Sequence, residues 1–198
     1  ALSVSDALTA ESTSAEPVAA PVEAPSYELT SYESAEGFDE AEELNRQRRL
    51  TLFQELGALY EELAELDQAI GAWREALNLN PQSLPFVERL AELYLSTDDW
   101  ASYSWSLTQK VALIEGVEER VALLMELARL YEERLEQHDE AINAYQAVLN
   151  LTPSALEPFA ELERLLQGLE RWEELVNLLF ARAEVTDDQD EQLSLYTR

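Results

Sequence analysis

The sequence predicts an all-α protein, a right-handed α-solenoid of stacked helical hairpins behind an acidic N-terminal tail. Three observations predict this fold class. Apolar residues recur at helical spacing, prolines after residue 38 occur only at 81, 85, 153 and 158, and the pattern of residues 50–83 returns lower in the chain. In a solenoid each hairpin has an apolar face that only its neighbours cover, so a repeated apolar pattern is typical of this fold.

The first 38 residues differ in composition from the rest of the chain. They are rich in Ala, Ser, Glu and Pro, and no basic residue precedes Arg46. We therefore expect a disordered acidic tail at 1–38 and the solenoid at 39–198. Tyr27, Tyr32 and Phe38 are candidates for a docking motif in this tail, and isolated aromatics in a solvated tail are the alternative.

Residues 50–83 carry the clearest hairpin pattern. One helical stripe contains Leu52, Phe53, Leu56, Leu59, Tyr60 and Leu63. A second stripe, before Pro81, contains Ile70, Trp73, Leu77 and Leu79. Asp67 lies between the two stripes and is the expected N-cap of the second helix.

The same unit returns 71 to 73 residues later. Tyr60, Ala69, Trp73 and Pro81 match Tyr131, Ala141, Tyr145 and Pro153, and further on Pro85-Phe86 matches Pro158-Phe159 and Trp100 matches Trp172. Two hairpins therefore make one super-repeat, and the predicted hairpins are 50–83, 84–117, 121–153 and 154–187, with a partial one at 188–198. Because the partial hairpin opens a helix without a polar cap, we expect a fragment of a longer array.

These residues resemble the tetratricopeptide repeat, a helix-turn-helix unit of about 34 residues. In residues 50–83 the resemblance rests on Phe53, Leu56, Gly57, Tyr60, Ala69, Trp73, Ala76 and Pro81. Residues 121–153 keep most of this pattern with one extra residue in the turn, and the other two hairpins match in length and apolar rhythm only. The alternation of strong and weak repeats is similar to that of long bacterial helical-repeat proteins.

The resemblance implies a binding groove, because in this family the first helix of each hairpin lines the concave face. The matching positions are Gln54, Ala58, Glu61, Glu62, Glu88, Glu92, Met125, Arg129 and Glu132. Such an acidic groove favours a basic or amphipathic segment of another protein, and a solvated face is the alternative. The Lys and Asn residues with which chaperone-binding members hold a C-terminal carboxylate are absent from these positions.

Composition excludes several other functions. The 198 residues contain no cysteine and one histidine, which argues against thiol nucleophiles and the usual zinc sites, and glycine-rich phosphate motifs are missing. A formal net charge of -28 disfavours nucleic acid and anionic membranes as partners. We expect no catalytic residue, cofactor, bound metal or membrane insertion. The lone His138 is interpreted as a solvated turn residue, and the four tryptophans as core residues, with Trp105 also considered as an exposed partner contact.

These observations predict a non-catalytic scaffold or adaptor that binds a partner polypeptide in the groove of its repeats. The alternative is a substrate- or partner-recruiting segment of a larger multidomain enzyme or assembly whose catalytic part lies outside this chain. We expect a soluble protein, and the lack of cysteine fits both cytoplasm and periplasm, of which the cytoplasm is favoured. The identity of the partner and the oligomeric state stay open.

Overall fold

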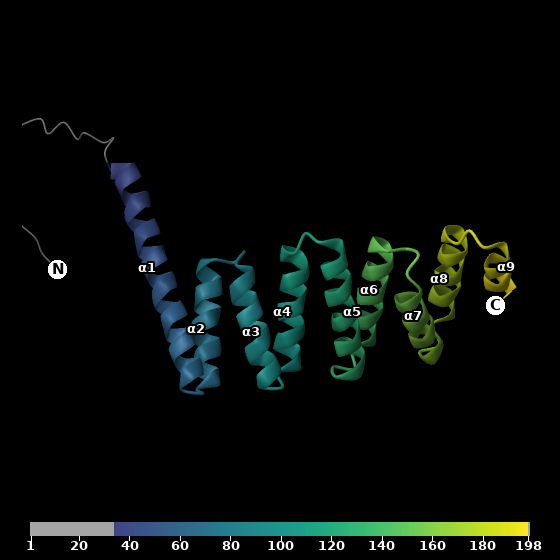
Figure 1. The fold of residues 1–198 in the computed structure, drawn as a ribbon, viewed down its shortest axis with the longest axis horizontal. Helices are drawn as coiled ribbons and strands as arrows, with labels where there is room; N and C mark the ends of the chain where they lie inside the picture. Colours follow the sequence, from purple (N-terminus) through teal and green to yellow (C-terminus); the bar gives the residue numbers. More distant parts are fainter. Residues whose placement is uncertain (1–33, 198) are drawn as a thin grey trace, which may run out of the picture. The chain divides into compact units, whose positions relative to one another are not determined.

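In the computed structural model, residues 34–197 are described, and they form nine α-helices without a strand (Figure 1). Side chains are described for residues 40–190 and 192–197. The helices are α1 (Ser34–Glu62), α2 (Leu66–Leu79), α3 (Leu84–Ser96), α4 (Trp100–Leu113), α5 (Val117–Glu133), α6 (His138–Leu151), α7 (Leu156–Gly168), α8 (Trp172–Val185) and α9 (Gln189–Thr197). The chain divides into two units, Ala1–Asp39 and Glu40–Arg198, and the second contains the repeats.

The second unit is built from consecutive hairpins. α3 packs on α4 and α5 on α6, and the hairpins join where α2 meets α3, α4 meets α5, and α6 meets α7 (Figure 1). The predicted fold class is confirmed, because each helix packs mainly on its neighbours in sequence, as expected of a helical repeat array.

The start of α1 differs from the prediction. The helix begins at Ser34, so its first residues fall inside the segment expected to be a tail. Phe38 lies in α1, and its side chain is outside the described part of the molecule. Tyr27 and Tyr32 lie outside the described residues, so the docking motif stays a prediction.

The helix boundaries fix the repeat register at 72 residues. α3 and α7 begin at Leu84 and Leu156, and α4 and α8 begin at Trp100 and Trp172. The predicted offset of 73 for the two Pro-Phe pairs was therefore wrong by one position: Val87 is the structural equivalent of Phe159, and both are buried. Burial, and not the shared Pro-Phe dipeptide, decides how α3 and α7 align. A shift of one residue would turn every side chain by about 100° around the helix axis and would expose the buried ones.

Each turn within a hairpin has a residue in the left-handed region. These residues are Ala64, Asp98, Glu136 and Glu170, with φ between 53° and 57°. Their places agree with the 72-residue register, so the same turn is used four times without glycine. The N-cap of α2 is Glu65 and not Asp67, which lies in the first turn.

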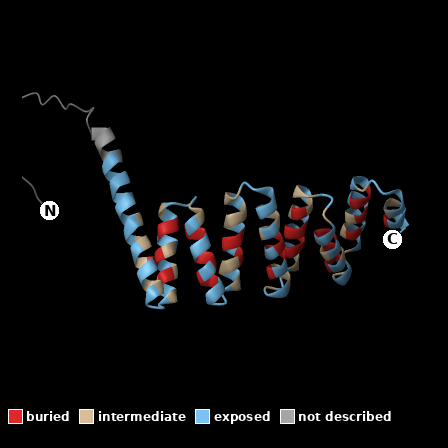
Figure 2. Ribbon diagram, viewed as in Figure 1, coloured by how far each residue is buried: buried red, intermediate tan, exposed pale blue. Residues whose placement is uncertain are grey.

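The predicted apolar stripe of α1 is split between the core and the surface. Phe53 packs in a buried cluster with Trp73 and Phe86. In contrast, Leu52, Leu59 and Leu63 are 53%, 49% and 58% exposed, and most of α1 is exposed (Figure 2). The sequence pattern could not separate these two groups, because both have helical spacing.

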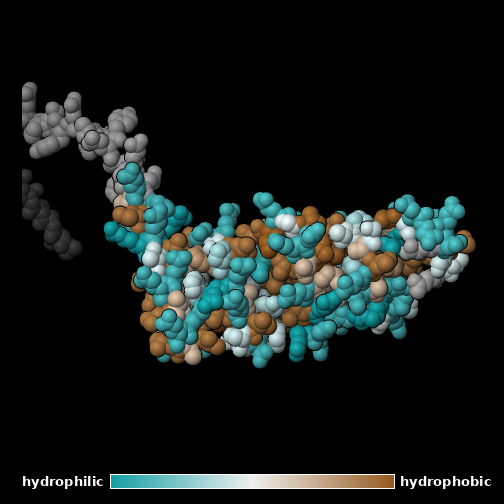
Figure 3. Space-filling view, viewed as in Figure 1, coloured by the Kyte–Doolittle hydropathy of each residue, from teal (hydrophilic) through white to brown (hydrophobic). Residues whose placement is uncertain are grey.

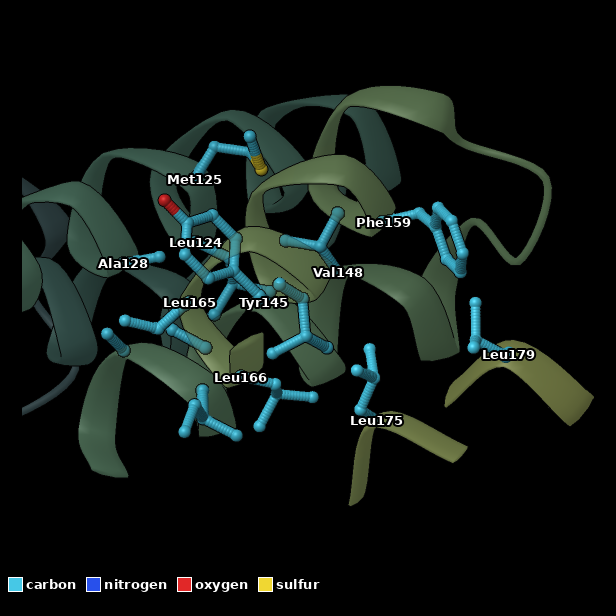
Figure 4. Packing of buried hydrophobic residues seen from close by; sticks show 14 of the residues in the cluster. Leu124, Met125, Ala128, Tyr145, Val148, Phe159, Leu165, Leu166, Leu175 and Leu179 are labelled. Atoms are coloured by element: carbon cyan, nitrogen blue, oxygen red, sulfur yellow. The ribbon is translucent and has the colours of Figure 1, made fainter. Parts of the chain in front are cut away.

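Close contact between α1 and α2 depends on Gly57. A Cβ at this position would lie 2.6 Å from Cε2 and 2.7 Å from Nε1 of Trp73, so the indole occupies the space of a side chain. In the third hairpin the equivalent residues are Ala128 and Tyr145, 0% and 1% exposed, within the cluster shown in Figure 4. Where the aromatic residue is smaller, as Tyr145 is compared with Trp73, the residue that faces it is larger, as Ala128 is compared with Gly57.

Candidate partner-binding surface

The first helices of the hairpins are α1, α3, α5 and α7, and the predicted groove residues lie on the first three of them. We call their shared surface the first-helix face. Ala58, Glu62, Glu88, Glu92 and Arg129 are exposed, and Gln54, Glu61 and Glu132 are half-buried. Met125 is only 8% exposed and belongs to the buried cluster around Tyr145 (Figure 4), so its prediction as a groove residue was wrong. Its side chain packs in the core that α5 shares with α6 and α7.

A cluster centred on Arg89 links α1 to α3. Arg89 donates from Nε to Glu61 over 3.0 Å and pairs with it a second time through Nη2, so the contact is bidentate. Nη1 donates to Glu92 over 2.7 Å. These carboxylates raise the pKa of Arg89 above its usual value. Glu61 also accepts from Nε1 of Trp73 at 2.6 Å, so one carboxylate connects the ion pair to the core of the first hairpin.

A second cluster, centred on Arg164, links α5 to α7 in the same manner. Arg164 donates from Nη2 to Glu132 over 2.6 Å and from Nε to Glu161 over 3.0 Å. Both carboxylates raise the pKa of Arg164. In the 72-residue register Arg89 is equivalent to Glu161, and Glu92 to Arg164. The arginine and glutamate have therefore exchanged places on α7, yet the arginine still reaches back to the preceding first helix.

These clusters reduce the negative charge of the predicted acidic groove. The side chains of Glu61 and Glu132 are only 15% and 16% exposed, and each is neutralised by an arginine of the next hairpin. Arg129 pairs with Glu157 at 2.5 Å, and Lys110 with Glu88 at 3.6 Å. The inner carboxylates link successive hairpins, and three outer ones are more exposed: Glu62, Glu88 and Glu92.

The second helices enclose two grooves that the sequence did not predict. One, of about 460 Å³, lies between α6 and α8 and is lined by Leu149, Asn150, Phe159 and Asn177, among others. The other, of about 610 Å³, lies between α2 and α4 at the position one super-repeat earlier. The only signal in the sequence was Trp105, which lines the α2–α4 groove and is 43% exposed, in agreement with the exposed alternative.

Two further interpretations need correction. Trp172 is 57% exposed, although its helical position predicted core packing; its equivalent Trp100 lies under Arg134, 4.9 Å from the ring centroid. His138 is the first residue of α6 and is half-buried. Its Nδ1 is buried and has no hydrogen-bond partner among the described residues, so it is not a freely solvated imidazole.

The described residues contain no group of three or more side chains placed to hold a metal ion. Within the same part of the chain, no helix combines the length and apolar character needed to cross a membrane.

Comparison with known proteins agrees with this architecture. Residues 123–158 match the family model described as tetratricopeptide repeat, which confirms the resemblance predicted from the sequence. The match covers the third hairpin, although residues 50–83 had shown the closer pattern. No curated protein matches the chain in sequence.

Solved structures of tetratricopeptide proteins are similar to this chain at low sequence identity. A crystal structure of MamA is 17% identical, with a TM-score of 0.42, over 75% of this chain and 81% of MamA. The first TPR domain of Spaghetti (RPAP3), bound to the HSP90 peptide SRMEEVD, is 21% identical, with a TM-score of 0.38, over 62% and 94%. The N-terminal domain of stress-induced protein-1 from C. elegans is 12% identical, with a TM-score of 0.43, over 61% and 96%.

Proposed function

We propose that this protein is a non-catalytic scaffold that binds a basic segment of another polypeptide along its first-helix face. The observation that carries the proposal is the charge of the two arginine clusters. Each contains two carboxylates and one guanidinium, so each leaves one negative charge on this face. The tetratricopeptide repeat at 123–158 supports a role in protein interaction.

The arrangement of the charges suggests how a basic segment would be held. Glu88 and Glu92 lie one turn apart on α3 and are 48% and 66% exposed. Lysine or arginine residues spaced by one helical turn would reach both carboxylates, and the overall charge of -28 would speed their approach. Apolar residues of an amphipathic partner would contact the exposed Ala58 of α1.

The test must spare the inner carboxylates, because a change at Glu61 or Glu132 would break links between hairpins. We therefore choose the exposed residues Glu62, Glu88 and Glu92 and change all three to glutamine. The control changes Glu75, Glu140 and Glu173 to glutamine; these residues are also exposed but lie on the second helices. Both variants lose three negative charges, and the first-helix variant also loses the ion pairs of Glu88 with Lys110 and of Glu92 with Arg89.

The probe is a labelled amphipathic peptide of leucine and lysine, and its affinity is measured by fluorescence anisotropy at several salt concentrations. We expect the first-helix variant to bind about tenfold more weakly, equivalent to about 1.4 kcal/mol, with a flatter salt dependence, and the control variant to bind nearly as the wild type. The acidic peptide SRMEEVD should not bind. Equal losses in both variants would show that only the overall charge acts and would contradict the proposed face.

A further inference from the structure

The outer side of α1 carries four leucines at heptad spacing. Leu52, Leu56, Leu59 and Leu63 are separated by four, three and four residues, the a/d spacing of a two-helix seam. Leu63 continues the helical path, because its N–H donates to the carbonyl of Leu59 over 3.0 Å. Three of these side chains are about half exposed, and Figure 3 shows hydrophobic surface at this end of the array, over the last turns of α1. We call these four residues the α1 leucine stripe.

The equivalent positions on α5 form an interface inside the chain. With the offset of 71 residues between the ends of α1 and α5, the stripe corresponds to Leu123, Leu127, Leu130 and Arg134. Leu127 and Leu130 are buried against Leu107 of α4, and Arg134 lies over the ring of Trp100. On α5, this side of the first helix therefore packs against the preceding hairpin. On α1, all four equivalent positions are apolar.

The charges at the two ends of the stripe have opposite signs. Arg46, Arg48 and Arg49 lie just before it, and they are three of only 13 basic residues in the chain. Arg46 pairs with Glu43, whereas Arg48 and Arg49 are exposed and have no ion-pair partner among the described residues. Glu65 and Asp67, also exposed, lie just after the stripe.

We propose that two copies of this chain associate by antiparallel packing of their α1 leucine stripes. A two-fold axis between Leu56 and Leu59 pairs Leu52 of one copy with Leu63 of the other. It also brings Arg48 and Arg49 of one copy toward the turn after α1 of the other, which carries Glu65 and is followed by Asp67 in the first turn of α2, whereas a parallel pair would bring arginines together. The stripe therefore matches a second copy of itself in shape and in charge.

The dimer leaves most of the proposed partner-binding face free, and only Glu62, three residues from Leu59, adjoins the stripe. Gln54 and Glu61 lie about half a helical turn from the stripe, on the opposite side of α1. The stripe is about 16 Å long at 1.5 Å per residue, so the interface is small and the dimer is expected to be weak and concentration-dependent.

Sedimentation velocity of the full 198-residue chain over a wide concentration series tests the association. Leu59→Glu places a charge in the stripe, and Leu95→Glu is its matched control, because the two leucines are 49% and 47% exposed. Circular dichroism verifies that both variants keep their helices. We expect a dimer for the wild type and for Leu95→Glu, and a monomer for Leu59→Glu.

Two further experiments test the orientation. Arg48→Glu and Asp67→Lys should each weaken the dimer, and the variant with both changes should regain it, because both salt bridges are then reversed. Since the chain has no cysteine, Leu52→Cys and Leu63→Cys can be mixed under oxidising conditions. An antiparallel pair forms the mixed disulfide, whereas a parallel pair joins Leu52→Cys to itself.

Three results would overturn the proposal. A wild-type chain that stays monomeric at all concentrations excludes the dimer. A dimer that survives Leu59→Glu uses another surface. A dimer that is lost in Phe180→Glu but kept in Arg48→Glu is formed at the exposed surface of α8 and α9, where the ring centroids of Phe180 and Tyr196 lie 5.7 Å apart.

Discussion

The first and third hairpins use different residues at the contact between their two helices. In the first, Gly57 and Trp73 fill the space between the two helices; in the third, Ala128 and Tyr145 do so. Trp73 is half-buried and donates to Glu61, whereas Tyr145 is almost fully buried, which raises the pKa of its hydroxyl to about 12. Both residues of the pair differ between the two hairpins, but the summed volume of the pair is nearly the same.

The two hairpins also differ in what surrounds them. α5 packs against α4 on one side and α6 on the other, so the third hairpin has neighbours on both sides. The outer stripe of α1 is exposed. The first hairpin should therefore be the less stable of the two, and changes in it should cost less free energy than equivalent changes in the third.

The largest effect is expected for Tyr145→Ala. Tyr145 is 1% exposed at the centre of the largest buried cluster, so its loss should reduce the free energy of unfolding by about 3–5 kcal/mol. Trp73→Ala should cost less, about 2 kcal/mol, because the indole is half-buried. Urea unfolding followed by circular dichroism measures both. An equal or larger loss for Trp73→Ala would contradict the comparison.

A medium effect is expected for Gly57→Ala. The added Cβ would overlap the Trp73 ring, and such overpacking costs about 1–3 kcal/mol. Gly71→Ala is the matched control, since a Cβ there would meet no atom within 4 Å. It should stabilise the protein by up to about 1 kcal/mol through helix propensity. The difference in sign is readily measured by thermal unfolding, and two changes of the same sign would contradict this account of Gly57.

The smallest effect is expected at the N-cap of α4, where the N–H of Ser102 donates to Asp99 over 3.1 Å. Asp99→Ala should cost about 1 kcal/mol at pH 7. Hydrogen bonding by Ser102 lowers the pKa of Asp99 from its ordinary 3.8, so this stabilisation is present above that pH and lost as the pH falls through the lowered value.

The control for this prediction is Asp67→Ala, which removes a first-turn carboxylate that is not a cap. It should cost only about 0.3–0.5 kcal/mol at pH 7. Urea unfolding of both variants near pH 7 and in strong acid provides the test. A difference between wild type and Asp99→Ala that persists in acid would show that the carboxylate does not act as the cap.

Much of the fold could be predicted from the sequence. Proline positions, apolar periodicity and the repeat offset can all be identified along the chain without knowledge of which residues meet in space. The candidate site was harder to predict. Met125 has the correct spacing for the first-helix face, but its side chain is drawn into the core by α6 and α7. Glu61 and Glu132 were recognised as acidic positions, yet their partners Arg89 and Arg164 lie 28 and 32 residues away, and no local pattern joins them.

The exchange of Arg and Glu between α3 and α7 is a second feature that could not be predicted from the sequence. Aligned by sequence, the two helices have opposite charges at equivalent positions, which hides their common role. Only the long reach of the guanidinium group, visible in three dimensions, makes both arrangements link successive hairpins.

The equivalence of the first and third hairpins can be tested by a double-mutant cycle. Gly57→Ala, Trp73→Tyr and the variant with both changes are compared by urea unfolding. Because the double variant reproduces the Ala128–Tyr145 pair, it should be at least about 1 kcal/mol more stable than the sum of the single changes predicts. Additive single effects would mean that Gly57 and Trp73 do not share one packing space, and that the first and third hairpins are not packed in the same way.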